Sequence, residues 1–305
     1  MKNFLYFIFF TLLFASCDVV VDLDIPEHEP VLVVNSILAT DDSIKASISH
    51  SVGAFDASTI SYVNNAAVEV YEDGTLLGLM DETASEGELG SVYEYHFNQM
   101  PTAGKTYAYE ITHPAYEAVR AETKVPTKIQ VMVPDVTLIA EEDWGERHYR
   151  VRFSFNDAAD ANFYRLRLII SSSYGTTFDY FESNDASIIA SSGVQSDGVA
   201  FYGDEALFDD DLFNGTEKEI SFDLFDYKYY WFEYENEDET DLSFTLELSS
   251  VTESYYTYIR SLRAHYNNQD QFLFAGEPVQ VFTNIENGLG IFGAISVDTV
   301  TLKLP

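Results

Sequence analysis

Short stretches in which apolar and polar residues alternate recur along most of this 305-residue chain, and they limit its fold more than any other feature. In residues 93–97, for example, aromatic residues alternate with Glu94 and His96. Successive side chains of a β-strand point to opposite faces of a sheet, so this period of two predicts strands with one buried face. The Asp73-Gly74 pair between two such stretches is typical of a hairpin turn.

The spacing of these stretches predicts an all-β protein with two domains. About seven short strands fall within residues 30–126, which fits an immunoglobulin-like β-sandwich. Residues 127–134 show no clear periodicity and predict a linker. Strand patterns resume afterwards, so we expect residues 135–305 to form a second β-sandwich or barrel domain.

One amphipathic helix is expected in the second domain, near residues 251–266. Its apolar face consists of residues that recur at helical spacing: Tyr255, Ile259, Leu262 and Tyr266. Ser250 and Glu253 have the spacing of a capping box, in which each side chain satisfies a free backbone donor of the other residue. The pattern therefore predicts that the helix begins just after Ser250.

The N-terminal segment predicts export and a lipid anchor. Lys2 precedes about twelve mostly apolar residues, which is the pattern of a secretory signal. The run is too short to cross a bilayer, which takes roughly 20 residues. The segment 14–17 resembles the bacterial lipoprotein box, in which the cysteine thiol is acylated. We expect residues 1–16 to be a lipoprotein signal peptide, Cys17 to carry the lipid and residues 17–29 to be an acidic tether. The alternative is an ordinary signal cleaved nearby, which leaves a free thiol.

The cysteine count agrees with lipidation. A secreted globular protein usually carries cysteines in pairs, whereas this chain has one. Acylation of Cys17 would consume it. No disulfide can form within the chain, so the apolar core alone must hold the fold.

The chain carries 51 acidic and 16 basic residues and a formal net charge of −35. Such a charge repels phosphate backbones, so we expect no nucleic acid partner. It also disfavours flat contact with anionic membrane surfaces, so we expect membrane contact through the N-terminal lipid. Hydrophobic residues make up 46% of the chain, which is more than disordered acidic chains carry.

Motifs of the common catalytic classes are absent from the sequence. It has no Gly-x-Ser-x-Gly elbow and no glycine-rich phosphate loop, and its six histidines lack metal-type spacing. We therefore expect no enzymatic activity and no cofactor. A hydrolase built on two of the many carboxylates stays open, because sequence does not show their separation.

Three adjacent carboxylates form a candidate calcium site. Asp209, Asp210 and Asp211 are followed by Asn214-Gly215, and oxygen ligands of this kind suit Ca²⁺. The segment departs from the D-x-[DN]-x-[DN]-G loop, and solvated charge is the simpler reading.

Aromatic residues are concentrated in residues 222–234. Strict alternation breaks near Tyr229, so both faces of a strand there would carry rings. Tyr227, Tyr229 and Trp231 are therefore candidate residues for binding a glycan or a peptide. The alternative is that the helix or the other domain covers the second face.

Five of the eight arginines lie within 21 residues: Arg147, Arg150, Arg152, Arg165 and Arg167. Arg150 and Arg152 would share one strand face, and Arg165 and Arg167 would share another. We expect these side chains to pair with carboxylates across the sheet. The alternative is a stripe that faces an anion or a partner on an otherwise acidic body.

Several segments together resemble a family of Bacteroidetes lipoproteins known as domain of unknown function 4249. They occur in order at 30–35, 65–74, 104–126, 162–166, 253–258 and 284–293, and the last two are the most specific. The resemblance implies an outer-membrane lipoprotein, exposed at the cell surface and accessory to a TonB-dependent transporter in nutrient binding or uptake. A glycan- or peptide-binding surface module without a transporter partner is the alternative.

Overall fold

The computed structural model describes residues 28–53, 61–87, 90–142, 146–172, 175–192, 200–226, 243–269 and 279–305. These residues form three β-sheets and two helices, α2 (Ala186–Ser192) and α4 (Glu253–Gln269). The predicted all-β class is thereby confirmed. Neither helix has the length and apolar character needed to cross a membrane within the part of the chain described.

The largest sheet has nine strands. Along its path lie β12 (Gly175–Asp179), β11 (Phe163–Ser172), β17 (Ser243–Val251), β18 (Leu289–Leu302), β1 (Leu32–Ala39), β2 (Ile44–His50), β6 (Gly90–Phe97) and β5 (Asp81–Gly87), and β15 (Glu205–Asp209) pairs with β11. A four-stranded sheet contains β4 (Thr75–Leu79), β3 (Ala67–Glu72), β7 (Thr106–His113) and β8 (Tyr116–Lys124). A five-stranded sheet contains β14 (Phe201–Gly203), β13 (Phe181–Ser183), β16 (Glu217–Asp226), β10 (Arg147–Asn156) and β9 (Asp135–Glu141).

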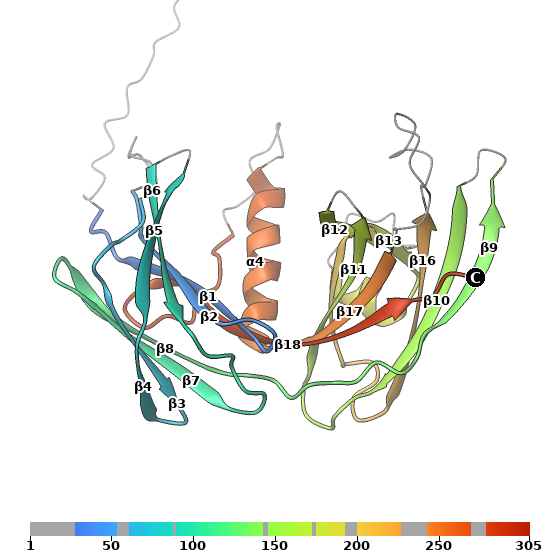
Figure 1. Ribbon diagram of the computed structural model, residues 1–305, viewed down its shortest axis with the longest axis horizontal. Coiled ribbons are helices and arrows are strands. Elements are labelled where there is room, and N and C mark those ends of the chain that lie inside the picture. The colour runs from blue at the N-terminus through green and yellow to red at the C-terminus, as the bar shows by residue number, and fades with distance from the viewer. Residues whose placement is uncertain are drawn as a thin grey trace, which may run out of the picture.

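Strand β18 joins two lobes (Figure 1). Its first half runs parallel to β1, from the pair Val33–Leu289 to the pair Ala39–Ile295. From Ile295 onward it runs antiparallel to β17 as far as Leu302. The nine-stranded sheet therefore supplies one layer to each lobe.

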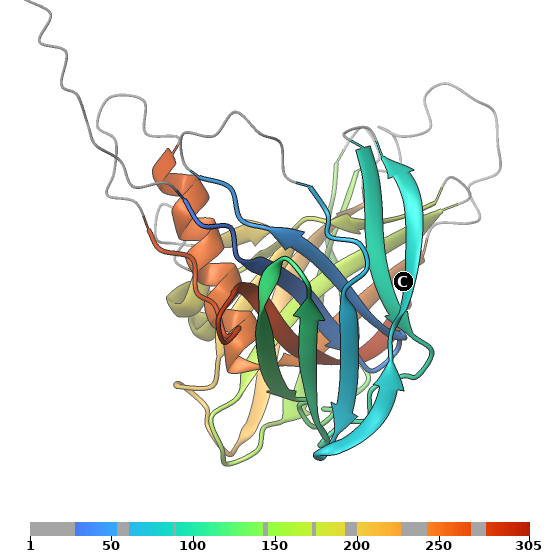
Figure 2. The ribbon, with the colours of Figure 1, turned by 90° about the vertical axis from the view of Figure 1, so that its left-hand side faces the viewer.

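In the first lobe, this sheet packs against the four-stranded sheet. Alternate residues of each strand enter a shared core, as in β1, where Val34 and Leu38 are buried and Asn35 is exposed. Strand β18 contributes Phe292, whose ring stacks on Tyr109 with centroids 4.1 Å apart. The first sandwich is thus completed by a strand that lies far from it in sequence (Figure 2).

In the second lobe, the other half of the large sheet packs against the five-stranded sheet. Its core is rich in aromatic side chains, among them Phe155, Phe181, Phe208 and Phe222. Residues 125–134, which contain the predicted linker, form neither helix nor strand. They are nevertheless held against β18, because the backbone N–H of Val131 donates to Asp298, 2.8 Å away. The second lobe is a sandwich, which agrees with the first of the two predicted alternatives.

Helix α4 stands where the two halves of the large sheet meet, between the lobes (Figure 1). Tyr255 is buried as predicted, whereas Tyr266 is 59% exposed. The capping-box prediction is wrong: β17 extends through Ser250, and the hydroxyl of Thr252 accepts the N–H of Tyr255 instead. Pairing with β11 and β18 holds Ser250 in the strand, so the helix can begin only after it.

Candidate functional site

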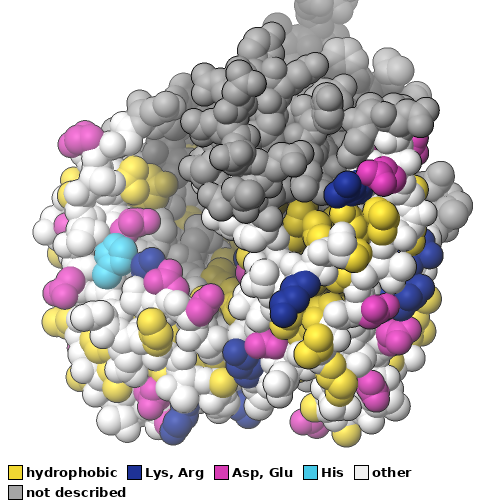
Figure 3. All heavy atoms as spheres, turned by 45° about the vertical axis from the view of Figure 1, so that its right-hand side comes forward, with side chains coloured by type: hydrophobic (Ala, Val, Ile, Leu, Met, Phe, Trp, Pro, Cys, Tyr) yellow, Lys and Arg dark blue, Asp and Glu magenta, His cyan; other side chains and the backbone are white. Residues whose placement is uncertain are grey.

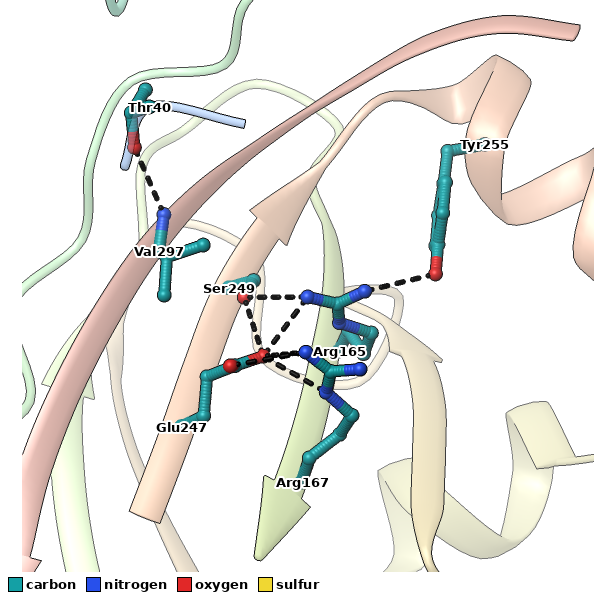
Figure 4. Close-up of polar contacts among 7 residues, drawn as sticks. All are labelled: Thr40, Arg165, Arg167, Glu247, Ser249, Tyr255 and Val297. Atoms are coloured by element: carbon teal, nitrogen blue, oxygen red, sulfur yellow. Dashed lines mark hydrogen bonds and ion pairs between the residues drawn. The ribbon is translucent and has the colours of Figure 1, made fainter. Parts of the chain in front are cut away.

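A polar cluster lies on the face of the large sheet that carries α4, close to the junction of the lobes (Figure 4). Its side chains come from three elements: Arg165 and Arg167 from β11, Glu247 and Ser249 from β17, and Tyr255 from α4. We call these five residues the arginine cluster. Near it, the backbone N–H of Val297 in β18 donates to the hydroxyl of Thr40, 3.3 Å away, at the end of β1.

Strand geometry places the arginines on this face. Leu166 and Leu168 point into the core of the second lobe, so Arg165 and Arg167 point the opposite way. Directly across the ladder, Arg167 is opposite Glu247. Cross-strand neighbours on one face are close enough to form an ion pair.

Glu247 binds both guanidinium groups. Its Oε1 accepts from Arg165 Nη2 at 2.9 Å and from Arg167 Nε at 3.0 Å, and its Oε2 accepts from Arg167 Nη2 at 3.0 Å. The Glu247 and Arg165 side chains are 7% and 6% exposed, whereas that of Arg167 is 18% exposed. One carboxylate thus holds two guanidinium groups, one of them almost fully buried.

Tyr255 ties the cluster to the helix. Arg165 Nη1 donates to the Tyr255 hydroxyl at 3.1 Å. Burial raises the pKa of Tyr255, although the neighbouring Arg165 acts to lower it. Burial acts to lower the pKa of Arg165, but Tyr255, Glu247 and Glu205 together outweigh it, so this pKa is raised. Both groups therefore keep their protons, and Arg165 keeps its charge, at neutral pH.

The positive charges of the cluster exceed the negative ones. Two guanidinium groups face one carboxylate, and the nearby Glu205 is bound by Arg263 at 2.6 Å. The buried Nε of Arg165 has no hydrogen-bond partner among the described residues. A buried donor normally has a partner, so this one is an exception that asks for an explanation.

The accessible side of the cluster is bordered by an aromatic ring. The Arg167 guanidinium carbon lies 4.0 Å from the centroid of Phe178, which is itself 45% exposed. In the space-filling view the surface is hollowed between the lobes, and basic side chains lie among hydrophobic ones on the second lobe (Figure 3). The arrangement combines a partly accessible cation, a ring and a fixed hydrogen-bond network.

The predicted pairing of arginines with carboxylates is confirmed. Arg150 binds Asp223 through two hydrogen bonds of 2.7 Å each, directly across the ladder. The remaining pairs are more exposed: Arg147 with Glu141 at 3.1 Å, and Arg152 with Asp135 at 3.7 Å. These arginines form no single stripe, because those of β10 and β11 belong to different sheets.

The three candidate calcium ligands have different surroundings. Asp209 accepts a hydrogen bond of 2.8 Å from the Tyr256 hydroxyl, and Asp210 accepts one of 2.9 Å from the backbone N–H of Asn162. Asp210 is buried, which raises the pKa of its carboxyl, whereas Asp211 is exposed. Within the described ranges, no three His, Cys, Asp or Glu side chains gather as a metal site would require.

The other predicted site residues, Cys17, Tyr227, Tyr229 and Trp231, lie outside the described residues. The structure adds an aromatic pair that sequence reasoning missed. Tyr180 and Tyr202 are 50% and 57% exposed, and their ring centroids are 5.3 Å apart. They are 22 positions apart in sequence, so no local pattern brings them together.

A model of the family described as Domain of unknown function (DUF4249) matches residues 19–301. Among solved structures, the chain is similar to the crystal structure of a DUF4785 family protein from Legionella pneumophila subsp. pneumophila str. Philadelphia 1, with 13% sequence identity and a TM-score of 0.23. The similarity covers 71% of this chain and 52% of the other, so the chain spans about half the length of that protein. No curated protein matches the chain.

Proposed function

Because the chain belongs to the DUF4249 family, whose description names no activity, we propose its function from its own residues. We propose a non-enzymatic surface lipoprotein of a Bacteroidetes outer membrane, anchored through Cys17. In this proposal it is accessory to a TonB-dependent transporter in nutrient binding or uptake. The apolar segment that ends at Cys17 is the observation that carries the proposal.

The architecture is compatible with this role. Two sandwiches share β18, and the surface is hollowed between the two lobes (Figure 3). The arginine cluster places a partly accessible cation on the helix-bearing face. A binding accessory needs a preformed surface of this kind, whereas a catalyst also needs reactive groups placed against a substrate.

Lipidation is tested by replacing Cys17 with serine in the full chain. The native protein should incorporate labelled palmitate and fractionate with the outer membrane, and C17S should do neither. Cys17 is the only cysteine, so no second thiol can take up the label. An unlabelled native protein would refute the anchor.

Partnership is tested by extracting the native lipoprotein in mild detergent and identifying co-purified proteins by mass spectrometry. A TonB-dependent transporter should be recovered with the native protein. The same purification of C17S measures association that does not depend on the anchor. Recovery as a lone monomer under every extraction condition would refute the partnership.

A surface module that binds a glycan or a peptide without a transporter is the second candidate. The observation that favours it is the exposed Tyr180–Tyr202 pair, because paired rings offer a stacking surface. Replacing both tyrosines with alanine should abolish retention on a glycan or peptide array. Tyr266→Ala is the matched control, because Tyr266 is 59% exposed and lies on α4. Equal retention by all three proteins would exclude this surface.

A further inference from the structure

We propose that the arginine cluster is a binding site for an oxyanion, namely a carboxylate or phosphate group of a small ligand, with Arg167 as its contact residue. The proposal does not depend on a transporter partner or on the lipid anchor. It follows from the way charges are distributed among the described arginines.

Among the described arginines outside the cluster, Arg260 donates to the Tyr256 hydroxyl, 2.7 Å away, and the others have carboxylates of their own. These pairs are Arg120 with Glu110, Arg147 with Glu141, Arg150 with Asp223, Arg152 with Asp135 and Arg263 with Glu205. Arg165 and Arg167, in contrast, share Glu247. A chain with 51 acidic residues has ample carboxylates to neutralise both, yet one positive charge stays uncompensated here. An uncompensated charge out of bulk water is costly, and a bound anion would remove that cost.

The hydrogen bonds of Arg167 leave one of its nitrogens available to the proposed ligand. Glu247 occupies Nε and Nη2 of Arg167, while no bond is formed by its Nη1 within the residues the structure describes. In Figure 4 this nitrogen carries no dashed line and points away from Glu247. Phe178 lies against the guanidinium plane, so the side chain is held on two sides. A guanidinium fixed in this way presents a free edge to an oxyanion.

Arg165 is more deeply buried than Arg167 and contributes a fixed positive charge to the site. Its terminal nitrogens donate to Tyr255, Glu247 and Ser249, and its buried Nε lacks a partner among the described residues. Burial weakens screening by water, so this charge adds to the attraction at Arg167. Arg165 is therefore a positioning residue, whereas Arg167 makes the contact.

The surface beside the cluster suits an oxygen-rich ligand. On β18, Thr299 is exposed and lies opposite Glu247 on the ladder. On β17, Thr245 is partly exposed and shares the face of Glu247. Hydroxyl groups at these positions can donate to ligand oxygens that the arginine does not reach.

Binding is tested with the full-length protein in detergent, by titrating acetate in one arm and inorganic phosphate in another. Chloride keeps the ionic strength constant in both arms. The side-chain ¹⁵N resonances of arginine report the contact, and calorimetry reports the affinity. Saturable binding in either arm that shifts the side-chain resonances of Arg167 supports the proposed binding site. The arm that responds identifies the oxyanion as a carboxylate or a phosphate. Failure of both arms to saturate would overturn the proposal.

The Arg167→Gln variant tests which residue makes the contact. Glu247 keeps Arg165 as its partner in this variant, so we expect a folded protein that binds at least tenfold more weakly. Arg152→Gln is the control, because Arg152 is 46% exposed and binds Asp135 on a different sheet. Unchanged affinity in R167Q, or equal losses in both variants, would overturn the assignment. If R167Q fails to fold, Phe178→Ala is the second variant. Unchanged affinity in F178A, together with an Arg167 resonance that does not shift when the native protein is titrated, would also overturn the assignment.

Discussion

Replacing Glu247 with glutamine is the sharpest test of the energetics of the arginine cluster. The change keeps the shape of the side chain and one oxygen acceptor but removes the charge that binds Arg165 and Arg167. Removing one partner of a buried ion pair costs about 3–5 kcal/mol. Since Arg167 is 18% exposed and the amide still accepts one hydrogen bond, we expect the lower end, about 3 kcal/mol. For a chain of this size the loss corresponds to a decrease in Tm of roughly 5 °C.

The assay is urea unfolding of native and E247Q proteins, followed by circular dichroism and tyrosine fluorescence. Glu141→Gln is the matched control, because Glu141 binds Arg147 at a site where both side chains are well exposed. Exposed pairs of this kind contribute about 0–1 kcal/mol, so E141Q should differ little from the native protein. High salt should not remove the loss in free energy of unfolding that E247Q causes, because buried ion pairs are weakly screened. A deficit of less than about 0.5 kcal/mol for E247Q would refute the reasoning, since a loss that small is typical of a surface pair.

Three further predictions concern the fold. Phe292→Ala, which removes a fully buried ring from the core of the first lobe, should lower the free energy of unfolding by about 3–5 kcal/mol and expose that lobe to protease first; cleavage confined to the second lobe would contradict this. Gly290→Ala should cost at least about 2 kcal/mol in urea unfolding, because φ is +104° and a Cβ would lie 2.1 Å from the carbonyl oxygen of Val34; native stability would show that the pairing of β1 with β18 can relax. For Asp210→Asn, the free energy of unfolding relative to that of the native protein should increase as pH rises from below 3.8 and should level off above the raised pKa of Asp210, because burial makes ionisation of this carboxyl costly in the folded protein. A difference in the free energy of unfolding that does not vary with pH would exclude this cause.

Local patterns predicted much of the secondary structure. Tyr95 alternates with polar neighbours and is fully buried in β6. The Asp73-Gly74 pair has positive φ at both residues and joins β3 to β4, as its composition indicates. Pairing of arginines across strands was also predictable, because short-range alternation decides which side chains share a face.

Long-range pairing could not be predicted in the same way. Nothing local indicates that β18 serves two lobes, because the unbroken run of buried residues from Ile291 to Val297 is compatible with any neighbouring strand. The cap of α4 was predicted at Ser250 but lies at Thr252, because pairing with a strand distant in sequence extends β17 through Ser250. Glu247 could not be singled out among 51 acidic residues, because only the ladder register places it opposite Arg167.

The position of β18 in the sequence has a consequence for folding kinetics. Val33 pairs with Leu289, which is 256 positions further along the chain. Contacts between residues so far apart in sequence form slowly. One edge of β1 therefore stays unpaired until residues 289–295 have been synthesised. Unpaired strand edges in folding intermediates invite association with other chains. A chain that stops before residue 289 should therefore aggregate instead of yielding a stable first lobe, and a chaperone that shields this edge would raise the yield of the complete protein.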